Sequence, residues 1–332
     1  MILVTGGAGY IGSHTCIALA QAGHEFTVFD NFSNSTTAVF DRMAQIIGRP
    51  VRWHEGDIRD PAALDAVFSA HRVSAVLHFA GLKAVTESIS RPVDYFDCNV
   101  HGSIALMKAM ERVGCKTLVF SSSATVYGLD QPMPVAEDAP RAVSNPYGRT
   151  KLVVEDLLHD VGSSDARWRI ATLRYFNPTG AHPSGLIGES PLGTPSNLMP
   201  LVCQVAAGIR PVVQVFGNDY PSPDGSGVRD FVHVMDLAEG HVAALDFLTN
   251  NSARIVVNLG TGCGTSVLEL IRTFERVSGR RVPYEIGPRR EADIGVSFAD
   301  VSLAQKVLGW VAKRDLEDMC RDAWRWQAAN SN

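Results

Sequence analysis

Short apolar runs alternate with longer segments of helical periodicity over the first 175 residues of the chain. The runs predict strands over residues 2–4, 26–29, 51–54, 75–78, 117–120 and 170–174. The intervening segments predict helices over residues 11–22, 38–47, 93–113 and from 147 past 158, with one more beginning at Pro61 behind the N-cap Asp60. Because the strands are short and almost wholly apolar, we expect a parallel sheet covered by helices on both faces, the doubly wound α/β (Rossmann) class.

The composition and periodicity of the sequence change after residue 176. Residues 177–230 are rich in Pro, Gly and Asn and show few periodic runs, which is typical of ligand-covering loops. A strand is then expected over residues 255–259, followed by a helix that begins with a capping box of Ser266 and Glu269. We therefore predict two domains, residues 1–176 and a smaller, loop-rich α/β domain over residues 177–332, with some later elements returning to the first.

Three glycines, Gly6, Gly9 and Gly12, mark the point where the first strand becomes the first helix. A pyrophosphate can approach the backbone closely only where Cβ atoms are missing, and a helix beginning near Tyr10 offers it unpaired N–H groups. Asp30 follows 18 residues after Gly12, where an acid accepts hydrogen bonds from the adenine ribose and repels a 2′-phosphate. Tight packing of strand on helix is the alternative for the glycines alone. With the acid in place, the pattern favours NAD over NADP.

A second glycine cluster, Gly260, Gly262 and Gly264, follows the strand expected at residues 255–259. It resembles another nucleotide-binding turn. No acid lies at the distance that such a site requires, so a structural role is favoured.

Three polar side chains point to proton transfer: Ser123 after the fifth strand, and Tyr147 and Lys151 in the following helix. Residues four apart lie on one face of a helix. A tyrosine with its ordinary pKa of about 10 is a poor base, and lowering that pKa to about 7 requires roughly 4 kcal/mol of preference for the phenolate. A nearby lysine ammonium and a positively charged nicotinamide ring both favour the phenolate. The alternative for the Tyr–Lys spacing alone is a surface pair.

Composition and charge exclude several other classes of function. The chain has 332 residues, of which 45% are hydrophobic and 20% charged, and a net charge of −5, so it has no general attraction to nucleic acid or anionic membranes. Six scattered cysteines suit reduced thiols and a cytoplasmic location. No apolar stretch reaches membrane-spanning length, and a first strand at residue 2 leaves no room for a signal peptide. None of the ten histidines has metal-ligand spacing, so no metal site is expected.

Several further sequence motifs follow one another along the chain. They read Asp57-Ile58, His78-Phe-Ala-Gly-Leu-Lys-Ala84, Ser121-Ser-Ser-Ala-Thr-Val-Tyr-Gly128, Leu173-Arg-Tyr-Phe-Asn-Pro178, Asn197-Leu-Met-Pro200, Gly227-Val-Arg-Asp230 and His233-Val-Met-Asp236. Together with the glycine turn and the Tyr–Lys pair, they make the chain resemble the extended short-chain dehydrogenase/reductases. The ordered set, which runs along nearly the whole chain, is similar to the UDP-glucose 4-epimerase family within that group.

The resemblance implies a role for each matching residue. Tyr147 would take the proton of the sugar 4-hydroxyl, Lys151 would hold the nicotinamide ribose and lower the tyrosine pKa, and Ser123 would bridge Tyr147 and the substrate. Positions matching cofactor contacts are Tyr10, Ile11, Asp30, Asn31, Asn34, Asp57, Ile58, Phe79, Ala80, Lys83 and Phe176. Positions matching UDP-sugar contacts are Lys83, Asn177, Asn197, Leu198, Phe216, Arg229, Arg290 and Asp293. Arg229 and Arg290 are also suited to a diphosphate on chemical grounds, apart from the resemblance, because it requires cationic groups that donate several hydrogen bonds. A solvated surface charge is an equal alternative for each arginine.

The implied reaction interconverts UDP-glucose and UDP-galactose. Hydride leaves carbon 4 of the sugar for NAD and returns to the opposite face after the 4-keto sugar has rotated. Such an enzyme should grip the remote uridine and phosphates and hold the sugar by few contacts. NAD is regenerated in each cycle and should therefore stay bound. The resemblance also implies a homodimer, in which the helices near 93–113 and 147–158 pair with those of a second subunit.

Two positions depart from the family pattern. Cys98 stands where relatives carry Asn, so an amide contact to the cofactor is either lost or moved to Asn99. Ser297 stands where some members have a tyrosine beside carbon 2 of the sugar, which predicts that UDP-N-acetylglucosamine and UDP-N-acetylgalactosamine are also accepted. The competing interpretations are that Ser297 lies away from the sugar or that Phe298 fills the space.

Two other functions compete with epimerisation. A nucleotide-sugar 4,6-dehydratase shares the first step but needs an acid pair after the fifth strand, where this chain has Ala124, Thr125 and Val126. A non-catalytic redox sensor on the same fold could dispense with the Tyr–Lys pair, which is intact here. The sequence therefore favours the epimerase.

Overall fold

A seven-stranded parallel sheet organises the chain. The structure is a computed structural model that describes residues 1–128, 131–290 and 294–330. The sheet has the order β11-β6-β5-β4-β1-β2-β3, and every neighbouring pair is parallel. Its strands are β1 (Ile2–Thr5), β2 (Phe26–Asp30), β3 (Trp53–Glu55), β4 (Ala75–His78), β5 (Thr117–Ser123), β6 (Arg169–Tyr175) and β11 (Arg254–Leu259). The expected doubly wound α/β fold is confirmed.

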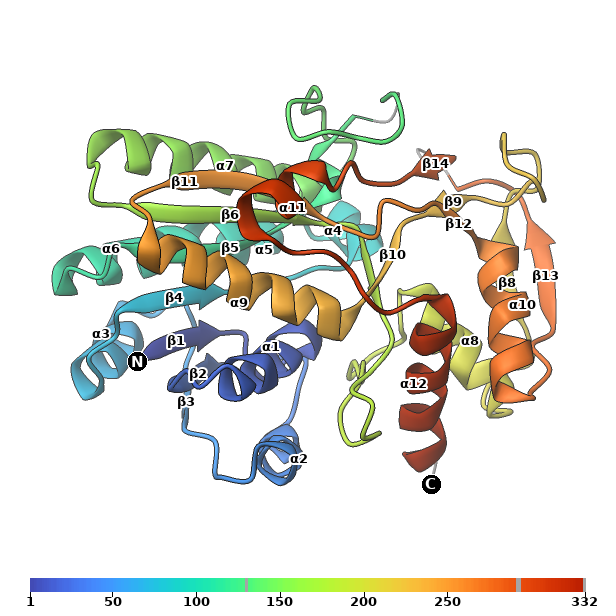
Figure 1. The fold of residues 1–332 in the computed structure, drawn as a ribbon, viewed down its shortest axis with the longest axis horizontal. Coiled ribbons are helices and arrows are strands. Elements are labelled where there is room, and N and C mark those ends of the chain that lie inside the picture. The colour runs from blue at the N-terminus through green and yellow to red at the C-terminus, as the bar shows by residue number, and fades with distance from the viewer. Residues whose placement is uncertain (129–130, 291–293, 331–332) are drawn as a thin grey trace.

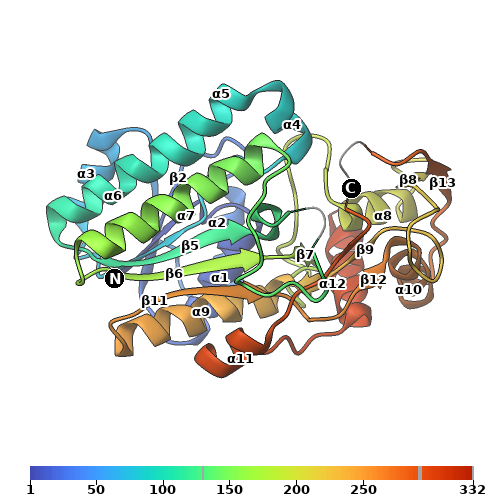
Figure 2. The same ribbon diagram turned by 90° about the horizontal axis from the view of Figure 1, so that it is seen from above.

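Helices cover both faces of this sheet, as Figure 2 shows from above. One face carries α1 (Tyr10–Gln21), α2 (Ala38–Ile47), α9 (Val234–Asn250) and α11 (Ser302–Leu308). The other carries α3 (Pro61–Ala70), α4 (Val85–Ser90), α5 (Pro92–Tyr95), η1 (Phe96–His101), α6 (Gly102–Val113) and α7 (Pro146–Ser164). Each face has its own buried apolar cluster, so the strands are buried on both sides, in keeping with their continuous apolar sequence.

The second part of the chain gathers beyond the carboxyl ends of the strands, at the right of Figure 1. Its helices are α8 (Leu198–Ala206), α10 (Val267–Ser278) and α12 (Leu316–Ala329), which share a third apolar cluster. Its strands are β8 (Val213–Phe216) with β13 (Tyr284–Gly287), β9 (Val228–Arg229) between β12 (Thr265–Ser266) and β14 (Val296–Ser297), and β7 (Asn177–Thr179) with β10 (Phe231–His233). This unit therefore lies where a parallel sheet presents its loops.

Local signals in the sequence locate several helix ends correctly. Asp60 caps α3 through the N–H groups of Ala62 and Ala63, and Ser266 and Glu269 form the expected capping box of α10. The strand expected at residues 51–54 is instead Trp53–Glu55, and the helix expected at 93–113 contains a π-helical turn at η1. Helix α9 was not anticipated at all. Among the described residues, no helix combines the length and apolar character needed to cross a bilayer.

Candidate active site

A cavity of about 460 Å³ opens at the carboxyl ends of the strands. Its walls come from the glycine turn after β1, the ends of β2, β4, β5 and β6, the start of α7 and the loop over residues 187–197. The sequence-predicted residues that it brings together are Gly6, Gly9, Tyr10, Ile11, Gly12, Asp30, Asn31, Asn34, Ile58, Phe79, Ala80, Lys83, Ser123, Tyr147, Lys151, Phe176, Asn177 and Asn197. Residues from both parts of the chain therefore share one cavity.

The three glycines of the turn have different tasks. A Cβ on Gly6, whose φ is +71°, would lie 2.6 Å from the backbone nitrogen of Ala80, and one on Gly12 would lie 2.3 Å from the carbonyl oxygen of Gly6. These two glycines let strand, helix and the end of β4 pack together. Gly9 lines the cavity, and the nearest atom to a Cβ there is the Gly6 oxygen at 3.3 Å. The turn thus presents bare backbone to a ligand at the N-terminus of α1.

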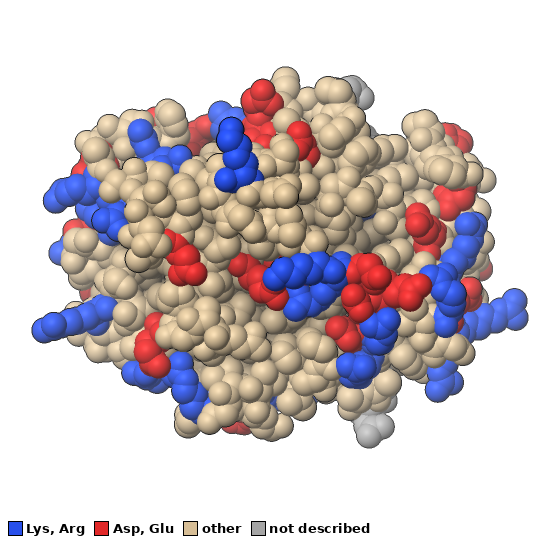
Figure 3. All heavy atoms as spheres, viewed as in Figure 1, with Lys and Arg blue, Asp and Glu red and all other residues tan. Residues whose placement is uncertain are grey.

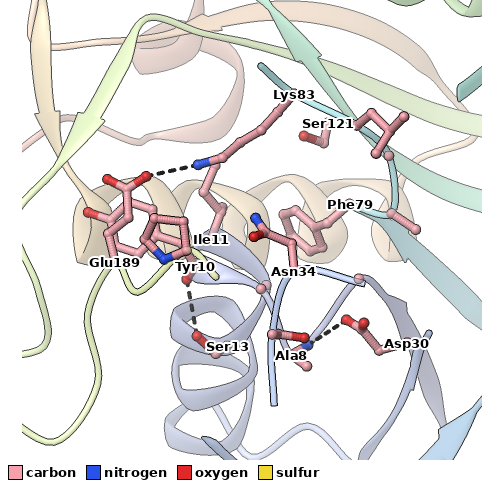
Figure 4. Close-up of a pocket in the computed structure, with 18 of the residues that line it drawn as sticks. Ala8, Tyr10, Ile11, Ser13, Asp30, Asn34, Phe79, Lys83, Ser121 and Glu189 are labelled. Carbon is pink, nitrogen blue, oxygen red and sulfur yellow. Dashed lines mark hydrogen bonds and ion pairs between the residues drawn. The ribbon is translucent and has the colours of Figure 1, made fainter. Parts of the chain in front are cut away.

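Asp30 closes this end of the cavity (Figure 4). One carboxylate oxygen accepts from the Ala8 N–H at 3.0 Å, within the glycine turn, and the other accepts from the Phe32 N–H at 2.9 Å. Burial raises the pKa of the carboxyl group, and these backbone hydrogen bonds oppose the rise. A carboxylate beside a bare-backbone turn fits the ribose and pyrophosphate of a dinucleotide.

Two expected cofactor contacts, Asp57 and Asn99, do not line the cavity. Asp57 accepts hydrogen bonds from Arg59 and from the amide of Asn31, and the Arg59 contacts hold its pKa well below the ordinary value. Asn99 is buried; its amide donates to the Leu82 carbonyl and to Thr150, and its oxygen accepts from the Leu82 N–H. Of the neighbouring pair it is Cys98 that lines the cavity. A cofactor contact by Asn99 stays a prediction, but its hydrogen bonds indicate a role in fixing the loop before α4.

Ser123, Tyr147 and Lys151 meet where β5 ends and α7 begins. The amide of Asn145 caps α7 by accepting from the Gly148 N–H at 2.8 Å, which places Tyr147 in the first turn. Lys151 lies one turn later; its ammonium donates to the Ser121 carbonyl at 2.7 Å and lies 5.8 Å from the centre of the Tyr147 ring. Ser123 accepts from both the N–H and the hydroxyl of Thr125, so its own proton is free for a further partner.

Burial governs protonation in this group. It raises the pKa of Tyr147 to about 12, which a hydrogen bond with Ser123 opposes, and lowers the pKa of Lys151 to about 8. The Lys151 ammonium faces the Ser121 carbonyl and lies 5.8 Å from the centre of the Tyr147 ring, and a lowering of the tyrosine pKa by Lys151 stays a prediction. Tyr147 is therefore protonated at neutral pH in the protein alone, and activating it requires an additional positive charge in the cavity.

Glu189 is a wall residue that the sequence reasoning missed. Its carboxylate accepts from Lys83 at 2.9 Å and from the amide of Asn197 at 2.7 Å, and its side chain is only 10% exposed (Figure 4). It therefore joins a predicted cofactor contact to a predicted substrate contact. One signal could have found it: no other Asp, Glu, Lys or Arg occurs between Arg174 and Arg210.

The other expected substrate residues lie on the second part of the chain and do not line this cavity. The Arg290 guanidinium lies 3.9 Å above the Phe216 ring, Ser297 pairs with Arg229 between β14 and β9, and Leu198 begins α8. Asp293 lies outside the described residues. Within the described ranges, no three His, Cys, Asp or Glu side chains are grouped as metal ligands would be.

The molecular surface adds one observation about partners. On the face drawn in Figure 3, Lys and Arg are interspersed with Asp and Glu, and no region of a single charge sign stands out. This face therefore shows no extended basic surface that would attract a phosphorylated ligand.

Comparisons with known proteins agree with this geometry. Residues 2–260 match the model of the NAD dependent epimerase/dehydratase family. The chain is 54% identical to the UDP-glucose 4-epimerase of Bacillus subtilis (strain 168), covering 100% of this chain and 98% of that one, and 51% identical to that of Dictyostelium discoideum, covering 100% and 96%. Its fold matches the UDP-glucose-4-epimerase of Stenotrophomonas maltophila, with bound NAD and formylated UDP-arabinopyranose, at a TM-score of 0.98 and 57% identity over 99% and 98% of the two chains. It also matches the Bifidobacterium longum enzyme in complex with NAD+ and UDP, at a TM-score of 0.96 and 48% identity over 100% and 99%. The chain therefore belongs to the NAD dependent epimerase/dehydratase family and, within it, to the UDP-glucose 4-epimerases.

Proposed function

We propose that this protein is an NAD-dependent enzyme that interconverts UDP-glucose and UDP-galactose. The observation that carries the proposal is one cavity that combines a bare-backbone dinucleotide turn with Ser123, Tyr147 and Lys151, in a chain that matches UDP-glucose 4-epimerases along its whole length. A 4,6-dehydratase is not favoured, because Ala124, Thr125 and Val126 follow β5 without a carboxylate.

The residues around the cavity divide the work. Gly9, Asp30 and Lys151 would hold NAD, which when bound accepts hydride from carbon 4, returns it, and adds a positive charge beside Tyr147. Tyr147 takes the proton of the 4-hydroxyl and later gives it back, and Ser123 passes the proton between them. Arg229 and Arg290 would anchor the diphosphate from the second part of the chain. The sugar, held by few contacts, is then free to rotate.

The direct test is incubation with UDP-galactose, followed by proton NMR of the sugar. We expect UDP-glucose to accumulate without added NADP, and we expect the purified protein to carry NAD(H). Absence of isomerisation in the presence of added NAD, or formation of a 4-keto-6-deoxy sugar, would contradict the proposal. The second outcome would identify a dehydratase.

The division at residue 176 is also a proposal. Residues 1–176, together with α9, β11 and α11, would form the NAD-binding unit, and the remaining residues up to 332 would bind the UDP-sugar. The sheet pairing of β11 with β6 supports the return of that strand to the first unit. We further propose a cytoplasmic location, in keeping with six free cysteines.

A homodimer is proposed through the helices on the α4–α7 face. Apolar side chains are exposed there, including Val93 at 78%, Ile89 at 65% and Val153 at 37%. We expect light scattering to give a dimer and Val93→Asp to shift it toward monomer, because a charge would be buried at the interface. Ile209→Asp, at another exposed apolar position after α8, is the control and should leave the mass unchanged. A monomeric wild type would overturn the proposal.

Substrate breadth is predicted from Ser297. The Phe298 ring lies against Gly264, within 3.1 Å of a Cβ built there, and successive side chains of an extended segment point to opposite faces. This placement of the ring supports the interpretation in which Phe298 leaves the space beside Ser297 open. We expect conversion of UDP-N-acetylgalactosamine by the wild type and its loss in Ser297→Tyr, with activity on UDP-galactose retained, because a full pocket rejects a larger group sterically. Equal N-acetyl rates in both proteins would show that this residue is not the gate.

A further inference from the structure

A buried ion pair lies directly beneath the proposed catalytic group. Glu155 follows Tyr147 and Lys151 on the same stripe of α7, one helical turn further along, and its side chain is 4% exposed. Arg174 of β6, also 4% exposed, binds it through two nitrogens, at 3.0 Å and 2.7 Å. The proposed proton and hydride transfers do not themselves require a buried carboxylate at the position of Glu155.

The carboxylate of Glu155 joins three elements. It accepts from the hydroxyl of Ser122 on β5 as well as from Arg174 on β6. Ser122 and Arg174 are direct partners in the β5–β6 register. Ser122 also stands between Ser121, whose carbonyl accepts from Lys151, and Ser123. If the hydrogen bonds of Glu155 were lost, α7 could shift against β5. Tyr147 and Lys151 would then be displaced relative to Ser121 and Ser123.

Arg174 extends the network away from the cavity. Its guanidinium donates to the Tyr127 hydroxyl and to the Glu137 carbonyl, each at 2.9 Å. Tyr127 in turn donates to the Asn258 side chain on β11 at 2.6 Å. Four of the five N–H groups of Arg174 and both oxygens of Glu155 are thus engaged, and α7 is tied to β5, β6 and β11 at one point.

Stability alone does not explain this pair. The attraction between two buried charges is largely offset by the cost of removing both from water. Apolar residues of similar volume at the same positions often give equal or greater stability. A fixed point below a catalytic helix has a different benefit, because misplacement of reacting groups by about 1 Å can cost 10²-fold in rate. The network supplies such a point.

We propose that Glu155 is a positioning residue for the reaction: held by Ser122 and Arg174, it sets the placement of Tyr147 and Lys151 against Ser121 and Ser123. The inference rests on the proposed function and adds to it a residue that contacts neither substrate nor cofactor. The pair also keeps the local charge balanced, since its carboxylate and guanidinium cancel.

Few other charges face the catalytic group. Cys98 of η1 and His78 of β4 lie near Lys151, and burial keeps both neutral, by raising the pKa of the thiol and lowering that of His78 to about 3. Tyr95 of α5 and Tyr175 of β6 lie near Tyr147, and burial raises the pKa of each phenol. Arg141 lies 3.7 Å from Glu155 at the solvent side. Glu155 and Arg174 are therefore the buried charges that the test has to vary.

The first variant is Glu155→Gln, assayed for kcat and KM on UDP-galactose against pH. We expect kcat to fall by about 10- to 10²-fold with little change in KM. The unbalanced Arg174 favours the phenolate of Tyr147, so its pKa falls, and the acid limb of the kcat profile moves to lower pH, on the order of one pH unit. The double variant Glu155→Gln with Arg174→Met restores charge balance without the network. The acid limb of the kcat–pH profile of this double variant should return to the wild-type position, while its kcat stays low.

Asp236→Asn is the matched control, because Asp236 is fully buried on α9 and paired with Arg314 away from the cavity. We expect Asp236→Asn to lower thermal stability and to leave both kcat and the acid limb of the kcat–pH profile unchanged. Wild-type kcat in Glu155→Gln, or an equal loss in Asp236→Asn with an unmoved limb, overturns the inference. If Glu155→Gln does not fold, a folded double variant with wild-type kcat overturns it, and one with low kcat supports it. An inactive wild type would instead refute the proposed function.

Discussion

Replacement of Tyr147 by phenylalanine is expected to lower turnover of UDP-galactose by about 10²–10⁴-fold, the usual contribution of a general base. The substitution removes only the hydroxyl that meets Ser123 and keeps the ring against Lys151. NAD content should therefore be unchanged. Steady-state kinetics and cofactor release on denaturation measure the two quantities.

Tyr95→Phe is the matched control for this result. The Tyr95 hydroxyl is also enclosed, but it donates to the Ala84 carbonyl and to Glu87 instead of facing the cavity. We expect it to lower stability and to leave turnover within a few-fold of wild type, since a lost hydrogen bond costs about 0.5–1.5 kcal/mol. Tyr147→Phe with more than about a tenth of the wild-type rate would exclude Tyr147 as the base.

Asp30→Ala is expected to have the second largest effect, on the retention and choice of cofactor. The substitution removes a carboxylate that accepts from Ala8 in the glycine turn and that would bind the ribose hydroxyls. Hydrogen bonds to a charged group contribute about 1.5–3 kcal/mol, so NAD affinity should fall by about 10- to 10²-fold. Discrimination against NADP should relax, because the charge that repels a 2′-phosphate is gone.

Dialysis followed by quantification of bound NAD and NADP checks this expectation. Asp41→Ala, which removes an exposed acid from α2 outside the cavity wall, should retain NAD like the wild type. Equal binding of NAD and NADP by the unmutated protein would show that Asp30 does not select the cofactor.

The cofactor half of the fold was predictable because its signals are local. The order strand, glycine turn, helix and acid lies within 30 residues, and caps such as Asp60 and Ser266 act over three or four positions. The Tyr147–Lys151 spacing likewise needs only the period of a helix. These features depend little on the rest of the molecule, so sequence reasoning found them.

The second part was harder because long-range pairing decides its structure. Strands β9 and β14 contain two residues each, and their pairing joins residues that lie far apart in the chain. Helix α9 has little amphipathic contrast because it packs against the sheet, α1 and α11, so its periodicity gave no signal. Glu155 looked like one more polar helix residue. Only the fold reveals that Arg174 and Ser122 face it.

The placement of β11 at the edge of the main sheet has a consequence for biosynthesis. Its partner β6 ends at Tyr175, but β11 begins only at Arg254, after most of the intervening loops and strands have been made. Until that stretch has left the ribosome, β6 is an open strand edge, the kind of surface that recruits foreign strands and promotes aggregation. The nucleotide-binding sheet therefore cannot be completed before residues 177–253, which include β7 to β10 and α8, have been synthesised. Truncation after residue 176 would yield an aggregation-prone fragment instead of an independent cofactor domain.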